Sequence, residues 1–136
     1  MEKIICYTDG ASRGNPGLAS AGAVIFEGET VLAEIRSPLG VQTNNWAEYE
    51  AVVQVLEKLH ELNLSNREIE IRMDSKLVAE QLSGNWKIKK DTLREQYNKI
   101  QTILANGFGN VTYTHVRREK NTYADRLANE ALDDKE

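Results

Sequence analysis

Residues 4–17 read Ile-Ile-Cys-Tyr-Thr-Asp-Gly-Ala-Ser-Arg-Gly-Asn-Pro-Gly, an apolar run joined to a glycine-rich segment with one acid, Asp9, at the junction. The apolar and β-branched residues predict a strand over 3–9. The glycines and Pro16 predict a turn directly after it. An acid directed towards a protein core is costly unless a cation meets it. The first strand is therefore predicted to carry a carboxylate to a binding site.

Three further acids stand at comparable places. Asp74 ends the alternating run 69–73, and Asp125 interrupts an apolar helical pattern. Glu48 falls on the apolar stripe of a predicted helix, whose other members are Val52, Val55, Leu59 and Leu62. Taken singly, an aspartate at such a place is more typical of a helix cap or a turn. Taken together, four carboxylates in these positions indicate a site for divalent cations.

The remaining pattern predicts a mixed α/β chain of the order βββαβααβα. Gly28-Glu29 predicts a hairpin between the second and third strands, Ser75 a helix N-cap, and Thr92-Leu93-Arg94-Glu95 a capping box. The predicted strands cover 3–9, 21–27, 30–36, 68–74 and 111–116, and the predicted helices 45–62, 76–82, 92–105 and 122–132.

The four acids are expected to meet if the first and fourth strands are parallel neighbours. Asp9 and Asp74 then share one edge of the sheet, and helices returning to that edge bring Glu48 and Asp125 beside them. Ligands of α/β sheets bind outside the carboxyl ends of the strands. The order of elements thus predicts one acidic crevice, although periodicity alone does not show that the acids are close in space.

Composition is that of an ordinary globular domain. The chain has 136 residues, of which 40% are hydrophobic and 28% charged, and we expect one domain over 1–136. No apolar run approaches the roughly 18 residues of a membrane helix, and no signal peptide pattern opens the chain. One cysteine, Cys6, lies in the first predicted strand and is expected to be buried. We expect a cytoplasmic monomer.

The net charge of −4 and the pI of about 5.3 argue weakly against a nucleic-acid partner. Two divalent cations at the four acids would offset that charge and leave the basic residues available for phosphates. Net charge therefore decides little about the partner.

Four segments resemble, in order, the motifs of the type 1 ribonuclease H family (RNase HI). They are 7–17, 43–48, 73–75 and 121–128, within a resemblance that runs from about residue 3 to residue 132. The resemblance implies the ribonuclease H fold, a five-stranded mixed sheet flanked by helices. It also implies endonucleolytic cleavage of the RNA strand of RNA–DNA hybrids.

The resemblance implies that Asp9, Glu48, Asp74 and Asp125 are the catalytic, metal-binding acids, with two Mg²⁺ ions as cofactor and Mn²⁺ as a possible substitute. Carboxylates and water suit the octahedral preference of Mg²⁺. Two such ions about 4 Å apart can activate a water and stabilise the leaving 3′ oxygen. The expected products carry 5′-phosphate and 3′-hydroxyl ends, and no serine, cysteine or histidine nucleophile is required.

The same resemblance implies a substrate surface for an RNA–DNA hybrid. Asn15, Asn44 and Asn45 match positions that meet the minor groove, and Thr43 and Arg13 match positions that contact backbone phosphate. Asn44-Asn45 also suits capping of the following helix, and a tryptophan among lysines also suits a solvated loop with a partly buried anchor. The expected substrate-binding residues are Gly10, Ala11, Ser12, Arg13, Asn15, Thr43, Asn44, Asn45, Lys76, Trp86, Lys87, Arg118 and Asn121.

Two departures from many members of the family stand out. The connection 117–121 is short and lacks a histidine, and His115 belongs to the preceding strand. Arg118 is expected to take part of that role near the scissile phosphate, but it stays protonated and cannot shuttle a proton. Residues 85–90 are all that remains of the long basic protrusion that some members carry.

Two alternatives to a hybrid-specific ribonuclease stay open. The first is a nuclease of the same fold that prefers double-stranded RNA or accepts a broader range of duplexes. The second is a hybrid-binding module with weak or lost chemistry, against which the four retained acids argue, because mutually repelling carboxylates serve no purpose in simple binding.

Overall fold

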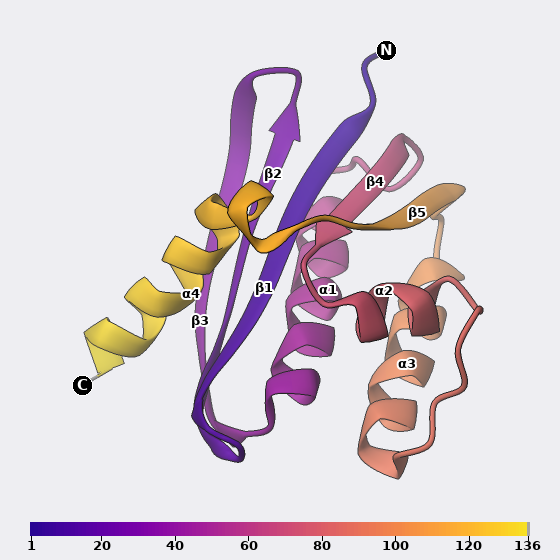
Figure 1. Cartoon of the computed structure of the whole chain (residues 1–136). Helices are drawn as coiled ribbons and strands as arrows, with labels where there is room; N and C mark the ends of the chain where they lie inside the picture. Colours follow the sequence, from indigo (N-terminus) through magenta and orange to yellow (C-terminus); the bar gives the residue numbers. More distant parts are fainter. Residues whose placement is uncertain (136) are drawn as a thin grey trace.

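The computed structural model describes residues 1–135, so residue 136 of the predicted domain lies outside the described residues. Its centre is a five-stranded mixed sheet with the strand order β3-β2-β1-β4-β5 (Figure 1). The strands are β1 (Ile4–Gly14), β2 (Gly17–Glu27), β3 (Thr30–Gln42), β4 (Glu68–Met73) and β5 (Asn110–His115). The helices are α1 (Asn44–Glu61), α2 (Lys76–Leu82), α3 (Asp91–Leu104) and α4 (Thr122–Lys135), and a 3₁₀ turn, η1 (Arg118–Lys120), precedes α4.

The predicted fold class and element order are confirmed. β1, β2 and β3 form the antiparallel meander, and β4 and β5 run parallel to β1. α1 packs on one face of the sheet with α3 against it, and α4 covers part of the opposite face (Figure 1).

The core lies between the sheet and α1, where the predicted apolar stripe is buried. Val52, Val55 and Leu59 have no exposed surface, and Cys6 is likewise fully buried. Leu62, which the stripe also included, is 38% exposed, because it is the C-cap residue beyond the last turn of α1. Burial of this stripe contributes the main hydrophobic stabilisation of α1.

The glycine-rich segment differs from its prediction. β1 does not end at Asp9 but continues to Gly14, paired with β2 down to Gly17, so that only residues 15 and 16 form the turn. β4, in contrast, ends at Met73, whose partner in β1 is Thr8. The antiparallel half of the sheet thus projects beyond the parallel half. Asp9 is the first residue of β1 without a neighbour in β4, and the sheet has a step at this residue.

The predicted capping box at the start of α3 is wrong. α3 begins at Asp91 with Lys90 as its N-cap, and no side chain caps it. The backbone N–H groups of Leu93 and Arg94 already bond to the carbonyl of Lys90, which places Thr92 inside the first turn. The predicted cap at Ser75 is confirmed, since its Oγ accepts the N–H of Val78 at 3.2 Å.

Helix α4 lies unusually close to β2. A Cβ atom added at Gly22 would lie 2.4 Å from both the Ala124 carbonyl oxygen and the Ala128 nitrogen. The Ser20 hydroxyl donates to the Ala128 carbonyl at 2.6 Å. The predicted apolar face of α4 is buried against the sheet, and its members are Ala124, Leu127, Ala128 and Ala131.

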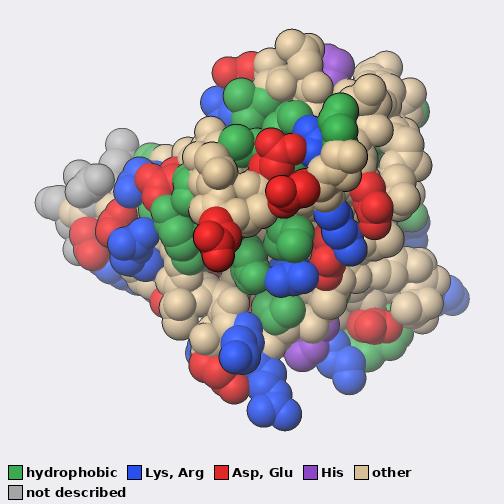
Figure 2. Space-filling model, turned by 90° about the horizontal axis from the view of Figure 1, so that it is seen from above, with side chains coloured by type: hydrophobic (Ala, Val, Ile, Leu, Met, Phe, Trp, Pro, Cys, Tyr) green, Lys and Arg blue, Asp and Glu red, His purple; other side chains and the backbone are tan. Residues whose placement is uncertain are grey.

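The surface carries interspersed charges. Viewed from above, acidic and basic side chains alternate with small apolar areas, and this face carries no patch of a single sign (Figure 2). Within residues 1–135, no helix is both long and apolar enough to cross a membrane.

We expect Gly22→Ala to lower the free energy of unfolding by about 2 kcal/mol, because the added methyl overpacks the contact between β2 and α4. Gly109→Ala is the matched control, since a Cβ there would meet nothing within 4 Å. Urea denaturation of both variants measures the difference. Equal stability of the two would contradict the close approach of α4.

Candidate active site

Three carboxylates gather at the step where β4 ends. Asp9 belongs to β1, Asp74 directly follows β4, and Glu48 comes from the second turn of α1. Each offers one carboxylate oxygen such that all three oxygens lie within 4.8 Å of one another. Asp9 is 6% and Glu48 8% exposed. They line a pocket of about 400 Å³, which we call the acidic pocket.

Glu48 reaches Asp9 because α1 touches the backbone of β1. A Cβ atom at Gly10 would lie 2.3 Å from the Glu48 nitrogen, so only glycine permits this approach. The Gly10 N–H donates to Glu48 Oε1. Thr43 Oγ1 caps the same helix by accepting the N–H of Trp46 at 3.2 Å. Gly10 is one of the predicted substrate-binding residues, but its N–H is bonded to Glu48 and not free for a substrate.

Asp125 lines the acidic pocket from the first turn of α4. Its side chain is on the exposed side of the helix and not, as the apolar pattern implied, among buried residues. Asn129 Nδ2 donates to the Asp125 carbonyl at 2.9 Å and lies 3.3 Å from its carboxylate Oδ1. Asn129 was missing from the predicted site, although its spacing of four residues from Asp125 places both on one face of the helix.

Burial and mutual repulsion favour protonation of the acids when no cation is present. Burial raises the pKa of Asp9 far above its usual range, and the charges of Glu48 and Asp74 raise it further. Burial also raises the pKa of Glu48, which the Gly10 N–H and Arg118 partly offset. The pKa of Asp74 is raised by burial and lowered again by Arg118.

The chemistry of this donor set fits a hard divalent cation. The close ligand atoms are all carboxylate oxygens, which Mg²⁺ and Mn²⁺ accept readily, and no histidine or cysteine among the described residues lines the pocket. Cations would relieve the repulsion that raises these pKa values. The arrangement can therefore bind divalent ions beside an anionic substrate.

Arg118 is the basic residue that lines the acidic pocket within residues 1–135. Its Nε lies 3.8 Å from Asp74 Oδ2, and its side chain is 89% exposed. The ion pair between Arg118 and Asp74 is therefore weak, so Arg118 can exchange Asp74 for an incoming phosphate with little loss of free energy. His115 lies at the end of β5, as predicted, and is absent from the lining of the pocket.

Asn121 is not at the surface. It is 1% exposed, and its Nδ2 donates to the carbonyl of Thr8 at 2.9 Å. Its side chain also hydrogen-bonds Asp74, which lowers the pKa of that acid. The predicted substrate contact is corrected to a structural role, because burial keeps this amide away from a bound molecule. It ties the start of α4 to the strand residue next to Asp9.

Apart from Arg13 and Lys76, the other predicted substrate residues line three adjoining hollows that share Asn45. Ala11, Ser12 and Asn44 line the acidic pocket, and the Ser12 hydroxyl donates to the Gln42 carbonyl at 3.0 Å. A second hollow of about 300 Å³ lies beside the β1–β2 turn, lined in part by Asn15, Thr43, Asn45 and Lys90. Asn15 Oδ1 accepts the N–H of Asn44 at 3.0 Å.

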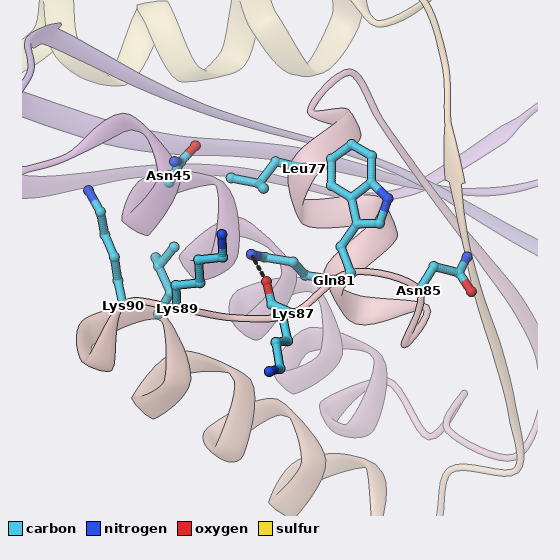
Figure 3. A pocket seen from close by; sticks show the side chains of 9 residues that line it. Asn45, Leu77, Gln81, Asn85, Lys87, Lys89 and Lys90 are labelled. Carbon is cyan, nitrogen blue, oxygen red and sulfur yellow. Dashed lines mark hydrogen bonds between the residues drawn. The ribbon is translucent and has the colours of Figure 1, made fainter.

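The third hollow, about 550 Å³, is the basic pocket shown in Figure 3. Trp86 is 44% exposed there, and Lys76 Nζ lies 5.9 Å from the centre of its ring. Arg13 lines none of these hollows and forms an ion pair with Asp133. The residues that line the basic pocket include Asn45, Gln81, Trp86, Lys87, Lys89 and Lys90.

Comparison with known proteins shows which families and structures this chain resembles. A family described as "Reverse transcriptase-like" matches residues 7–131. The chain is 46% identical over 133 residues to a bifunctional protein of Mycobacterium tuberculosis, covering 96% of this chain and 36% of that protein. The chain thus spans about a third of the length of that relative.

Two shorter relatives carry more specific names. A ribonuclease HI of Halobacterium salinarum is 43% identical over 133 residues, which cover 97% of this chain and 65% of that protein. A ribonuclease H of Ruthia magnifica subsp. Calyptogena magnifica is 34% identical over 149 residues, with coverage of 98% of this chain and 97% of that protein.

Solved structures agree with the fold. LC11-RNase H1, isolated from compost, superposes with a TM-score of 0.93 at 45% identity, covering 98% of each chain. A crystal structure of LC11-RNase H1 in complex with an RNA/DNA hybrid gives a TM-score of 0.93 at 44% identity, with 96% of this chain and 97% of that chain covered.

We expect Asp9→Asn to raise the stability of the metal-free protein at pH 8 by about 2 kcal/mol, because it removes a buried acid whose raised pKa forces folding to take up a proton at that pH. An acid whose folded pKa is raised destabilises the fold above its unfolded pKa, and this effect fades as pH falls towards about 4. The stability gain should therefore shrink at pH 5.

Urea denaturation in a chelator at both pH values measures this gain, with Glu57→Gln, an exposed acid on α1, as the control. Adding Mg²⁺ should stabilise the parent protein more than Asp9→Asn. A variant less stable than its parent at pH 8 would contradict the electrostatic account.

Proposed function

Because the chain belongs to the ribonuclease H family, we propose that it is a metal-dependent endonuclease that hydrolyses the RNA strand of RNA–DNA hybrids. The observation that carries this proposal is the cluster of Asp9, Glu48 and Asp74, whose carboxylate oxygens lie within 4.8 Å of one another at the step in the sheet. A structural relative with 44% identity has been crystallised with such a hybrid.

The acids would hold two Mg²⁺ ions, with Mn²⁺ as a substitute. Asp9, Glu48 and Asp74 would be the inner ligands, and Asp125 would complete the set from α4. When bound, such ions supply an activated water, charge neutralisation at phosphorus and stabilisation of the leaving 3′ oxygen. The products would carry 5′-phosphate and 3′-hydroxyl ends.

The protein's own part is to hold these acids together and to orient the duplex. Gly10 fixes Glu48 through backbone contact, Asn121 supports Asp74, and Asn129 holds Asp125. Without these contacts, the repulsion between the acids would separate them. Their spacing is therefore set before any ion or substrate arrives, which lowers the reorganisation needed during the reaction.

Recognition of the hybrid would rest on its shallow minor groove, where the RNA strand presents 2′-hydroxyls. Asn44 and Asn45 amides can both donate and accept hydrogen bonds, and Ser12 lies beside them. Lys89 and Lys90 would neutralise phosphates, and Trp86 would pack against a sugar or base. Little sequence specificity is expected, because the minor groove code is degenerate.

Arg118 would contact the scissile phosphate from its exposed position beside Asp74. Its guanidinium can bind two phosphate oxygens at once. It cannot transfer a proton, so it would stabilise charge and the proton would leave through water.

We expect Mg²⁺-dependent cleavage of a labelled RNA strand in an RNA–DNA hybrid, and no comparable cleavage of RNA duplex or DNA duplex. Glu48→Gln should lower turnover by at least about 10³-fold, because it removes an inner metal ligand. Glu57→Gln, on the same helix but exposed, should retain parental turnover.

The products should accept extension by a polymerase, which requires a free 3′-hydroxyl. Binding of the hybrid with no cleavage would favour the binding-module alternative. Cleavage of RNA duplex at a similar rate would favour the broader nuclease.

We expect Arg118→Ala to lower kcat about tenfold, because it removes a charge that stabilises the transition state. Arg117→Ala is a close control, since Arg117 is the neighbouring exposed arginine and does not line the acidic pocket. Steady-state kinetics at fixed ionic strength separate kcat from KM. Unchanged kcat and KM in Arg118→Ala would exclude a role for this residue.

A further inference from the structure

Gln81 is a buried polar residue at the base of the basic pocket. It belongs to α2 and is 5% exposed. The side-chain amide forms a hydrogen bond through each of its two polar atoms. The Tyr49 hydroxyl donates to Oε1 at 2.7 Å. Nε2 donates to the Lys87 carbonyl at 3.0 Å (Figure 3). A buried amide with both ends bonded is a rigid connection, because any rotation breaks a hydrogen bond in a low dielectric.

The two partners of Gln81 belong to different parts of the proposed machinery. Tyr49 is fully buried in α1 and directly follows Glu48. Lys87 belongs to residues 85–90, which we call the basic loop and which contain neither helix nor strand. Gln81 therefore links the helix that carries a metal-binding acid to the loop that carries Trp86 and the lysines.

Besides the bond from Gln81, the basic loop is held by the packing of Ile88 against the core and by hydrogen bonds near its two ends. At its start, the N–H groups of Asn85 and Trp86 bond to the Glu80 carbonyl at 2.9 and 3.3 Å. Towards its end, Arg94 donates to the Ile88 carbonyl at 3.1 Å from an exposed position. The side-chain bond from Gln81 is partly buried, whereas the one from Arg94 is exposed, so the Gln81 bond should contribute more to the position of the loop.

We propose that Gln81 is a positioning residue for substrate binding, which sets the basic loop at a fixed distance from the acids. This inference rests on the proposed function and extends it. Lys89 and Lys90 would hold the duplex. The duplex would then be aligned with the acidic pocket only if the basic loop and α1 keep a fixed position relative to each other. Glutamine suits this place, because one short side chain provides both a donor and an acceptor.

Gln81→Met tests the proposal, since methionine fills a similar volume but leaves the Lys87 carbonyl without its buried partner. Gln96→Met is the matched control. Gln96 is 4% exposed on α3, and its Nε2 donates to Glu50 Oε1 of the same helix α1 at 3.0 Å. The control thus removes an equally buried glutamine bonded to α1, away from the basic loop.

Hybrid binding is measured in an Asp125→Asn background, which prevents cleavage during the titration. We expect Gln81→Met to raise Kd about fivefold and to lower the slope of log K against log salt by about 1, as one phosphate contact is lost. When Asp125 is intact, Gln81→Met should raise KM and leave kcat within about twofold of the parent value. Gln96→Met should leave Kd and the slope unchanged.

A second measurement needs no substrate. In a Trp46→Phe background, Trp86 is the remaining tryptophan, and acrylamide quenching of its fluorescence reports how accessible the basic loop is. Gln81→Met should increase quenching, and Gln96→Met should not. Equal quenching in Gln81→Met and its parent would overturn the inference, as would an equal loss of affinity in Gln96→Met. Absence of hybrid binding by the parent would instead refute the proposed function, while quenching would still test the role of Gln81.

Discussion

Repulsion among carboxylates at the end of β4 is the constraint on which the rest of the structure depends. Without constraints from the backbone, this repulsion would turn the side chains of Asp9, Glu48 and Asp74 away from one another and towards water. The backbone prevents this by direct contact, with α1 against Gly10 and α4 against Gly22. Gly22 is also the partner of Asp9 across the β1–β2 ladder. Two glycines next to the same acid thus allow helices from both faces to approach it.

The sequence predicted those features that follow from local periodicity. The order of elements, the buried stripe of α1 and the apolar face of α4 all depend on spacing that the chain itself displays. The length of β1 could not be read in the same way, because residues 10–14 are extended only through pairing with β2. Small polar and glycine residues there resemble a turn until their partner strand is known.

The roles of Asn121 and Gln81 were not predicted correctly from the sequence for a similar reason. Asn121 looks like a surface residue because its neighbours are charged, yet it fills a buried junction that includes Thr8 of β1. Gln81 carries no motif, and its role arises from contacts with Tyr49 and Lys87 that lie far from it or across a loop. A side chain whose role is to contact other parts of the protein is harder to recognise in the sequence than a side chain that binds an ion.

The step in the sheet also defines a length. β1 continues for six residues beyond Thr8, its last residue paired with β4, and ends at Gly14. At about 3.4 Å per residue, this ledge measures about 20 Å. Gly10, Ala11 and Ser12 of this ledge line the acidic pocket. The unequal lengths of two neighbouring strands therefore leave space beside β1, and the pocket occupies that space.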